Sequence, residues 1–336
     1  MIKKILFKIS GSFESGFGHI RRSVTLASEL NKLLDVDKIG FLCDCSDIHI
    51  SDLLSQYKCV LKRQSNEEIL EYVSTNNFST LVIDDPSDNT ELCKQLKRYL
   101  PDIEVVCLDY FNYSSPFVDT IINLFNHNND VSVPEKKFAG KYYEGLKYAI
   151  IRDNFMPYIG RNKQILPEPK KVLITFGGAD TAGNTIKALR FLEDTGYSGR
   201  VDVVAGLFFR HVNELKEFST GKKFGCFVHH NIDNLEEYIY EADFAFIGPG
   251  TTMMESCSVG IPVVVFPESE RAYRFARTLE TVNAIKLVNY KNQDLSGVKD
   301  IFNDYEQKAR MSTSARKLID GKGKIRISNI ILNKTS

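Results

Sequence analysis

Residues 246–266 have the sequence FIGPGTTMMESCSVGIPVVVF, and this stretch decides the fold class. It begins in an apolar run typical of a buried strand, turns at Gly248 and Gly250, and continues with a helical segment. Gly260 and Pro262 then lead into a second apolar run. Strands that are apolar along their whole length are buried on both faces, and parallel neighbours need a crossover helix between them. The stretch therefore predicts part of a parallel α/β sheet.

The same alternation of short apolar runs and helical segments fills most of the chain. The first half contains the runs KKILFKI (3–9), KIGFLCD (38–44), CVLKR (59–63), TLVIDD (80–85), IEVVCLD (103–109) and DTIINL (119–124). The second half contains the runs KKVLITF (170–176), RVDVVAG (200–206), KFGCFVH (223–229), DFAFIG (243–248) and IPVVVF (261–266). We therefore expect two Rossmann-like, doubly wound parallel-sheet domains.

The predicted boundary lies in residues 156–170, MPYIGRNKQILPEPK, which contain three prolines and no clear period. We expect an N-terminal domain over 1–157 and a C-terminal domain over 168–336, the latter ending in an outer helical tail from about residue 295. Ligands of open parallel sheets bind beyond the carboxyl ends of the strands. Two such domains would face each other across an interdomain cleft that holds a two-part ligand.

Composition excludes several classes of protein. Of the 336 residues, 43 are Lys or Arg and 43 are Asp or Glu, so no global field favours nucleic acid or an anionic membrane. No apolar run approaches a membrane span, and the opening MIKKILFK is too polar for a signal sequence, so we expect a cytoplasmic protein. The seven cysteines are an odd number, which favours reduced thiols, and the lone C-x-C at 43–45 does not predict a metal site. The oligomeric state stays open.

The loop GSFESGFGHIRRS (11–23) follows the first predicted strand and is rich in glycine. It is not a P-loop, because Phe17 stands where lysine is needed, and it lacks the third glycine of a dinucleotide fingerprint. Gly16 and Gly18 permit a tight backbone, and His19 and Arg22 open the next helix. The field of a helix N-terminus favours the neutral imidazole that a general base requires. We predict that His19 is catalytic and that Gly16, Gly18 and Arg22 contact substrate; a capping histidine is the alternative.

Two turns of the second half resemble anion sites. In GADTAGNT (178–185) a glycine turn precedes a helix, so Gly178 is a candidate for binding phosphate through backbone N–H groups. The alternative is that the glycines form a tight turn needed only for packing. Gly250, Thr251 and Thr252 are expected to bind a pyrophosphate at a helix N-terminus. Glu255, about one turn into that helix, is placed to accept hydrogen bonds from ribose hydroxyls. The structural alternative is that Thr251 is the N-cap of the helix and that Glu255 interacts favourably with the helix dipole.

Aspartates follow two strands of the first half. Asp84 ends TLVID and Asp109 ends IEVVCLD, so both should lie at the carboxyl edge of the sheet. Each is a candidate for binding sugar hydroxyls, although aspartate is also an ordinary turn residue after a strand.

Four ordered motifs together resemble one family over about residues 5 to 270. The family is that of the UDP-sugar hydrolases of pseudaminic acid synthesis and related spore-coat polysaccharide proteins, of the GT-B glycosyltransferase class. The motifs are G-x-G-H-x-x-R at 16–22 with LA at 26–27, GLKYAIIRDNF at 145–155, FGGAD at 176–180, and GTTMMESCSVGIP at 250–262.

The resemblance implies a reaction without metal or cofactor, in which water attacks the anomeric carbon of a UDP-sugar, UDP leaves and the configuration inverts. His19 matches the family's catalytic histidine. Gly250, Thr251, Thr252 and Glu255 match its diphosphate and ribose site, and Ile232, beside Asn231, matches the backbone that recognises the uracil.

The chain departs from the family where the sugar would bind. The family has Asp-His-Tyr or Asp-Ser-Tyr where this chain has Asp84, Asp85 and Pro86, and it has Asn-Gln where this chain has ESER at 268–271. The sequence therefore predicts a nucleotide-sugar hydrolase and keeps two alternatives. One is a GT-B glycosyltransferase with a glycan, lipid or protein acceptor, and the other is a nucleotide-sugar sensor without turnover.

Overall fold

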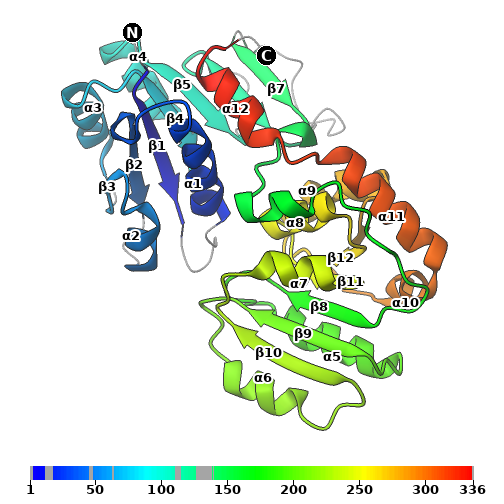
Figure 1. Cartoon of the computed structure of the whole chain (residues 1–336). Helices are drawn as coiled ribbons and strands as arrows, with labels where there is room; N and C mark the ends of the chain where they lie inside the picture. Colours follow the sequence, from blue (N-terminus) through cyan, green and yellow to red (C-terminus); the bar gives the residue numbers. More distant parts are fainter. Residues whose placement is uncertain are drawn as a thin grey trace. The chain divides into compact units, whose positions relative to one another are not determined.

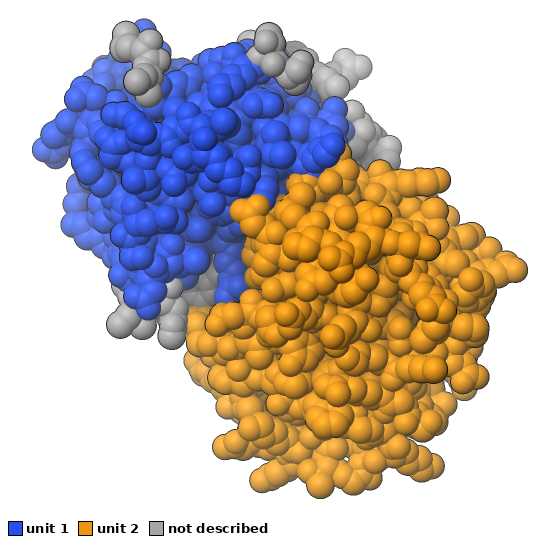
Figure 2. All heavy atoms as spheres, in the orientation of Figure 1, with its two compact units in different colours: residues 1–150, 322–336 blue, residues 151–321 orange. Residues whose placement is uncertain are grey.

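The computed structural model of this chain describes residues 3–11, 18–44, 48–62, 64–109, 115–125, 138 and 140–334. The chain forms two compact units, which Figure 2 colours separately. The first contains residues 1–150 and 322–336, and the second contains residues 151–321. Both units consist of a parallel sheet with helices on its two faces, so the predicted two-domain α/β architecture is confirmed (Figure 1).

The first unit contains a seven-stranded sheet in the order β3-β2-β1-β4-β5-β6-β7, and its described pairings are all parallel. Its strands are β1 (Ile5–Ser10), β2 (Ile39–Asp44), β3 (Lys58–Val60), β4 (Thr80–Asp84), β5 (Glu104–Leu108), β6 (Thr120–Asn123) and β7 (Lys141–Glu144). Its helices are α1 (Gly18–Asn31), α2 (Ile48–Leu54), α3 (Asn66–Thr75), α4 (Thr90–Tyr99) and α12 (Gly323–Ile331).

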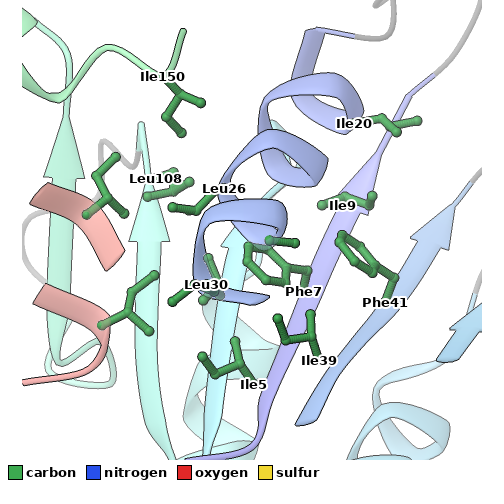
Figure 3. Packing of buried hydrophobic residues seen from close by; sticks show 14 of the residues in the cluster. Ile5, Phe7, Ile9, Ile20, Leu26, Leu30, Ile39, Phe41, Leu108 and Ile150 are labelled. Carbon is green, nitrogen blue, oxygen red and sulfur yellow. The ribbon is translucent and has the colours of Figure 1, made fainter. Parts of the chain in front are cut away.

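Strand β1 lies near the middle of this sheet and is buried on both faces. Phe7 is paired in register with Phe41 of β2 and with Val82 of β4, and the rings of Phe7 and Phe41 stack at 5.0 Å. These side chains point toward the face that α1 covers, where they meet Leu26 and Leu30 (Figure 3). The alternate residues of the strands point toward α3 and α4. Burial on both faces explains why these strands are continuously apolar in sequence.

The second unit contains a six-stranded sheet in the order β10-β9-β8-β11-β12-β13. Its strands are β8 (Lys171–Thr175), β9 (Arg200–Ala205), β10 (Gly225–His230), β11 (Phe244–Ile247), β12 (Val263–Val265) and β13 (Lys286–Leu287). Its helices are α5 (Asn184–Asp194), α6 (Val212–Ser219), α7 (Leu235–Glu241), α8 (Thr251–Val259), α9 (Glu270–Thr281), α10 (Ser296–Asn303) and α11 (Tyr305–Leu318).

An aromatic core fills one face of this second sheet. Phe191 of α5 contacts Phe246 of β11 edge to face at 5.6 Å and Phe302 of α10 at 6.2 Å. Such edge-to-face pairs add to the free energy gained from burying the rings. On the same side, Leu215 of α6 and Met311 of α11 complete the core.

The helices of both units are short. Helices α1 and α11, each of 14 residues, are the longest in the described part of the chain. Within the described ranges, no helix combines the length and the apolar character that crossing a bilayer requires.

The break between the units lies earlier than the sequence predicted. The units divide after Ile150, and the proline-containing segment 156–170 is fastened to the second unit. The Tyr158 ring lies 4.7 Å from that of Tyr240 in α7, and the buried Lys308 of α11 donates to the Pro167 carbonyl at 2.7 Å. The prolines predicted an irregular connection, but Pro157 lies in a 3-10 helix, Asp153–Tyr158. Contacts with α7 and α11, which the sequence does not reveal, make the segment part of the second unit.

The end of the chain also departs from the predicted domain 168–336. The tail is helical as expected, but its last helix, α12, belongs to the first unit. Ile327 and Ile331 are fully buried in the core beneath α1. Arg326 donates to the Lys147 carbonyl at 2.8 Å. The apolar side chains of α12 therefore complete the core of the first unit.

Replacing a buried isoleucine of α12 tests this placement. Ile331→Ala should lower the free energy of unfolding of the first unit by about 3 kcal/mol, because it leaves a cavity in that core. Ile325→Ala in the same helix is the matched control, since Ile325 is 41% exposed, and its effect should stay within about 0.5 kcal/mol. Urea unfolding followed by circular dichroism measures both. Equal effects of the two substitutions would contradict the assignment of α12 to this core.

Candidate functional site

The imidazole of His19 bonds to a buried carboxylate in the first unit. His19 is the second residue of α1, and its Nδ1 lies 2.7 Å from Oδ1 of Asp84, the last residue of β4. Asp84 is fully buried, whereas a quarter of the His19 side chain is exposed. The order β1-β4 in the sheet brings the two together, because α1, the helix after β1, starts beside the end of β4. Gly18 is the half-buried first residue of α1, and Gly16 lies outside the described residues.

Two further residues of α1 hold the same carboxylate. Arg22, one turn after His19, donates from Nε to Oδ2 of Asp84 at 2.7 Å and from Nη2 to Oδ1. Ser23 Oγ donates to Oδ2 at 2.8 Å. Ser23 was not identified from the sequence, where nothing distinguishes it from a solvent-exposed helix serine. The carboxylate is thus saturated by donors from a single helix.

The donors keep Asp84 ionised despite its burial. Burial alone would raise the pKa of Asp84, but the charge and hydrogen bonds of Arg22, together with the bond from His19, hold the pKa well below its ordinary value. An ionised carboxylate only accepts hydrogen bonds. Nδ1 of His19 must therefore carry the proton that it shares with Asp84, which leaves Nε2 with a lone pair. Among the described residues, Nε2 has no hydrogen-bond partner.

Arg22 stays charged between two carboxylates of the first unit. Burial alone would lower the pKa of Arg22, but the facing carboxylates of Asp84 and Asp109 raise it well above its ordinary value. The network then contains two carboxylates and one guanidinium.

Three residues predicted to bind substrate, two of them through its sugar hydroxyls, are occupied within the unit instead. Both oxygens of Asp84 are taken by donors from α1. Arg22 lies between Asp84 and Asp109, and its side chain is 12% exposed. Asp109 bonds to Arg22 through Oδ2 and accepts the Leu124 N–H through Oδ1 at 3.2 Å. The geometry therefore assigns Arg22, Asp84 and Asp109 to positioning His19, and it does not support direct contacts of these residues with a sugar.

The second unit presents an uncapped helix N-terminus at the carboxyl edge of its sheet. Ile247, the last residue of β11, is paired with Thr175 of β8 and Val265 of β12, so the following turn lies between two neighbouring strand ends. Gly250 is the N-cap of α8, with φ of 142°, and it provides no side-chain cap. Thr251 was an alternative N-cap, but it is the first helical residue. The first N–H groups of α8 therefore lie at this turn, and the half-buried residues Thr251 and Thr252 begin the helix there.

The role predicted for Glu255 needs correction. Its side chain is 1% exposed and is held on both oxygens by Arg152, with Nε at 2.6 Å from Oε1 and Nη2 at 2.9 Å from Oε2. A buried carboxylate in a two-point ion pair is not open to ribose hydroxyls, so the geometry makes Glu255 a positioning residue for Arg152. The sequence could not show this partner, which lies 103 residues earlier in the chain.

Arg152 was not identified from the sequence, although it lies in the motif GLKYAIIRDNF. Burial alone would lower the pKa of Arg152, but the hydrogen bonds and charge of Glu255 raise it, so the guanidinium stays charged. Its Nη1 has no partner among the described residues. The position of Arg152 directly after the apolar run AII was the available signal. A fixed cation beside α8 adds to the attraction that the helix N-terminus has for an anion.

The glycine turn 177–183 does not present an open anion site. Asp180 accepts the N–H groups of Asn184 and Thr185, both at 2.8 Å, so its own carboxylate caps α5. Gly178 accepts the Phe208 N–H at 2.9 Å, and a side chain at Gly206 would collide with the Gly177 carbonyl. The prediction that Gly178 binds phosphate is therefore not supported, and the alternative of a tight packing turn describes this geometry.

The loop after β10 contains Ile232, the residue that the family resemblance matches to the backbone that recognises uracil. Ile232 is half-buried in this loop, and the preceding Asn231 has φ of 49° and donates to the Ala205 carbonyl at 2.9 Å. His229 bonds through Nε2 to Asp202 at 2.9 Å.

In the described part of the chain, no group of three or more His, Cys, Asp or Glu side chains is arranged to hold a metal ion.

Comparisons with other sequences find two relatives. No family model matches the chain. The uncharacterized protein MJ1062 of Methanocaldococcus jannaschii is 29% identical over 281 residues, 80% of this chain and 56% of the relative, so the chain spans little more than half of that relative's length. The spore coat polysaccharide biosynthesis protein SpsG of Bacillus subtilis is 22% identical over 338 residues, 96% of this chain and 95% of SpsG. This similarity agrees with the spore-coat part of the resemblance.

Comparisons with solved structures establish the fold. Acinetobacter baumannii MurG has a TM-score of 0.71 at 13% identity and covers 98% of this chain and 99% of its own. A putative UDP-N-acetylglucosamine 2-epimerase from Listeria monocytogenes has a TM-score of 0.66 at 12% identity, with coverage of 99% and 98%. S. aureus MnaA, in a co-structure with UDP, has a TM-score of 0.64 at 16% identity, with coverage of 100% and 99%. The chain therefore has the GT-B type of fold, as the sequence predicted.

Removing the charge of Asp84 should destabilise the first unit. Asp84→Asn keeps the shape but leaves Arg22 buried with one carboxylate fewer, and we expect the free energy of unfolding to fall by about 3 kcal/mol at pH 7. Asp102→Asn, at an exposed aspartate of the same unit, is the control and should change it by less than about 0.5 kcal/mol.

The loss should depend on pH in a defined direction. Since the folded pKa of Asp84 lies below its ordinary value of 3.8, its contribution is complete above that value and disappears as the pH falls through the folded pKa. Urea unfolding at pH 7 and at successively lower pH should show the wild-type and Asp84→Asn stabilities converging. A difference that stays constant with pH would contradict the ionised, buried carboxylate.

Proposed function

We propose that this chain is a nucleotide-sugar hydrolase that uses a UDP-sugar and contributes to the synthesis of surface-glycan precursors. The observation that carries the proposal is the His19–Asp84 pair, which fixes an imidazole with its bare Nε2 directed away from the buried carboxylate. The open N-terminus of α8 beside Arg152 supports a diphosphate ligand. The similarity to SpsG and the resemblance of the four motifs support the sugar-nucleotide class.

In the proposed reaction His19 is the general base. Its Nε2 takes a proton from a water molecule as the water oxygen forms a bond to the anomeric carbon. The bond from that carbon to the diphosphate oxygen breaks, so UDP leaves with the electron pair and the sugar is released with inverted configuration. The imidazolium formed is stabilised by Asp84, which it faces at 2.7 Å, and by the network that Arg22 completes.

The second unit is proposed to bind the leaving group. Charge develops on the diphosphate as the bond breaks, and fixed donors stabilise such charge without reorganising. The donors are the first N–H groups of α8, the hydroxyls of Thr251 and Thr252, and Nη1 of Arg152, which Glu255 holds in place. The Ile232 backbone is proposed to recognise the uracil. The reaction requires that one substrate molecule contacts both units.

A glycosyltransferase is the second candidate, because the residues on the sugar side differ from those of the hydrolases. Asp85 bonds to Lys8 and to Ser10, and Ser269 caps α9 by accepting the Ala272 N–H at 3.2 Å. Both side chains bond to other groups of the protein and not to a sugar. An acceptor other than water is therefore compatible with these positions. A sensor without turnover has less support, because the His19–Asp84 pair retains an orientation that binding alone would not need.

Turnover without an acceptor separates these functions. The wild-type chain, incubated with UDP-sugars and water alone, should release UDP and a free sugar of inverted anomeric configuration, measured by proton NMR. His19→Asn should abolish this release and leave the Kd for UDP within a few-fold, because the nucleotide is bound by the second unit. His211→Asn is the control, at a histidine whose side chain is 72% exposed.

The outcomes distinguish the alternatives. Release that depends on an added glycan, lipid or protein acceptor would replace the hydrolase with the transferase. Full activity of His19→Asn would remove His19 from the mechanism, and binding of UDP without any turnover would favour the sensor.

Removing one hydroxyl tests the diphosphate site. Thr251→Val keeps the shape of the side chain and should raise the Kd for UDP about tenfold, as expected for a lost hydrogen bond to a charged group. Thr281→Val, at an exposed helix end of the same unit, should leave the Kd unchanged. Isothermal titration calorimetry measures both. Equal affinities of the Thr251→Val variant and the wild type would refute the proposed contact.

A further inference from the structure

The edges of the two sheets differ in how they are protected. In the described sheets, the edge strands β3, β7 and β13 have three, four and two residues, and each contains a lysine. Short strands and lysines are the usual protection against pairing with another chain. The fourth edge strand, β10, has six residues, GCFVHH, and none of them is Lys, Arg, Asp or Glu. Its Phe227 is 47% exposed.

The open side of β10 presents main-chain donors and acceptors. Gly225 donates to the Gly199 carbonyl at 3.1 Å and Asn231 donates to the Ala205 carbonyl at 2.9 Å, both toward β9. Alternate residues of a parallel strand bond to the same neighbour. The N–H and C=O groups of Cys226, Val228 and His230 therefore point away from β9. No other described strand pairs with β10 on that side.

The side chains along this edge are held in place by a buried aspartate. Phe227 and His229 point to the same face of the sheet, since they are two residues apart. Asp202 of β9 is 1% exposed and accepts hydrogen bonds from Arg200 at 2.8 Å and from His229 at 2.9 Å. The Arg200 guanidinium lies 4.4 Å from the centre of the Phe227 ring. The exposed phenyl ring is thus part of an ordered surface.

We propose that β10 is a dimerisation edge, at which a second copy of this chain pairs with it antiparallel about a two-fold axis. The three outward residues set the register. Val228 of each copy lies opposite Val228 of the other, and Cys226 lies opposite His230. Each of these residues then donates and accepts one main-chain hydrogen bond. Phe227 lies opposite His229 of the other copy, in a close pair that does not hydrogen-bond through the main chain.

The charges favour a second copy as the partner. A two-fold axis places each residue of the strand opposite a residue of the same strand, so any charge in β10 would meet like charges. The strand contains none, and Asp202 balances the nearby Arg200. The two symmetric contacts between phenyl and imidazole rings cover the exposed Phe227 in both copies. The edge is therefore complementary to itself.

Analytical ultracentrifugation of the full chain over the micromolar range tests the proposal. The wild type should sediment as a dimer, and Phe227→Lys should raise the dissociation constant at least about tenfold, because it loses both ring contacts and adds a charge to each copy. Tyr99→Lys, which replaces an aromatic residue that is 60% exposed in the first unit, is the matched control and should remain dimeric. Circular dichroism should show that both variants are folded.

Hydrogen exchange gives a second measurement on the same proteins. The amides of residues 225–230 should exchange more slowly in the wild-type dimer than in Phe227→Lys, because pairing occupies the outward N–H groups. A wild-type chain that stays monomeric throughout the range would overturn the proposal. A dimer that Phe227→Lys leaves intact, or one with unprotected amides in this strand, would overturn it as well.

Discussion

The buried carboxylate of Asp84 is the constraint from which the chemistry of the first unit follows. A carboxylate without access to water is costly unless donors surround it. Here the donors come from His19, Arg22 and Ser23, all within the first two turns of α1. The same bonds that keep Asp84 ionised fix the helix against the end of β4 and set the orientation of the imidazole. Stability and the proposed chemistry therefore depend on one cluster.

The second unit uses a buried carboxylate in a similar way. Glu255 in α8 is held on both oxygens by Arg152, which enters from the segment preceding the second sheet. In each unit a buried carboxylate orients a basic side chain, an imidazole in the first unit and a guanidinium in the second. This arrangement separates positioning from substrate contact. It explains why the acidic residues selected from the sequence as ligands are occupied by protein donors.

The sequence predicted those features that depend on local patterns. Continuous apolar runs predicted strands buried on both faces. Glycine turns predicted that His19 and Thr251 each lie at the carboxyl edge of the sheet in their own unit. Features that depend on distant partners were not predictable. Asp84 ends a strand, a position where a ligand, a cap and a buried ion pair have the same sequence signal. Glu255 could not be paired with Arg152 by any spacing rule. The helix α12 is amphipathic, but its pattern does not reveal which of two cores it completes.

The protonation of the His19 ring tests the central claim most directly. Nitrogen NMR of chain labelled at its six histidines, assigned with His19→Asn, reports which ring nitrogen has the proton. At a pH where the ring is neutral, the account predicts a protonated Nδ1 and a bare Nε2 for His19. It also predicts that this preference weakens when Asp84 is replaced by Asn. A proton on Nε2 in the wild type would contradict the account, because the ring would then have no lone pair to accept a proton from water.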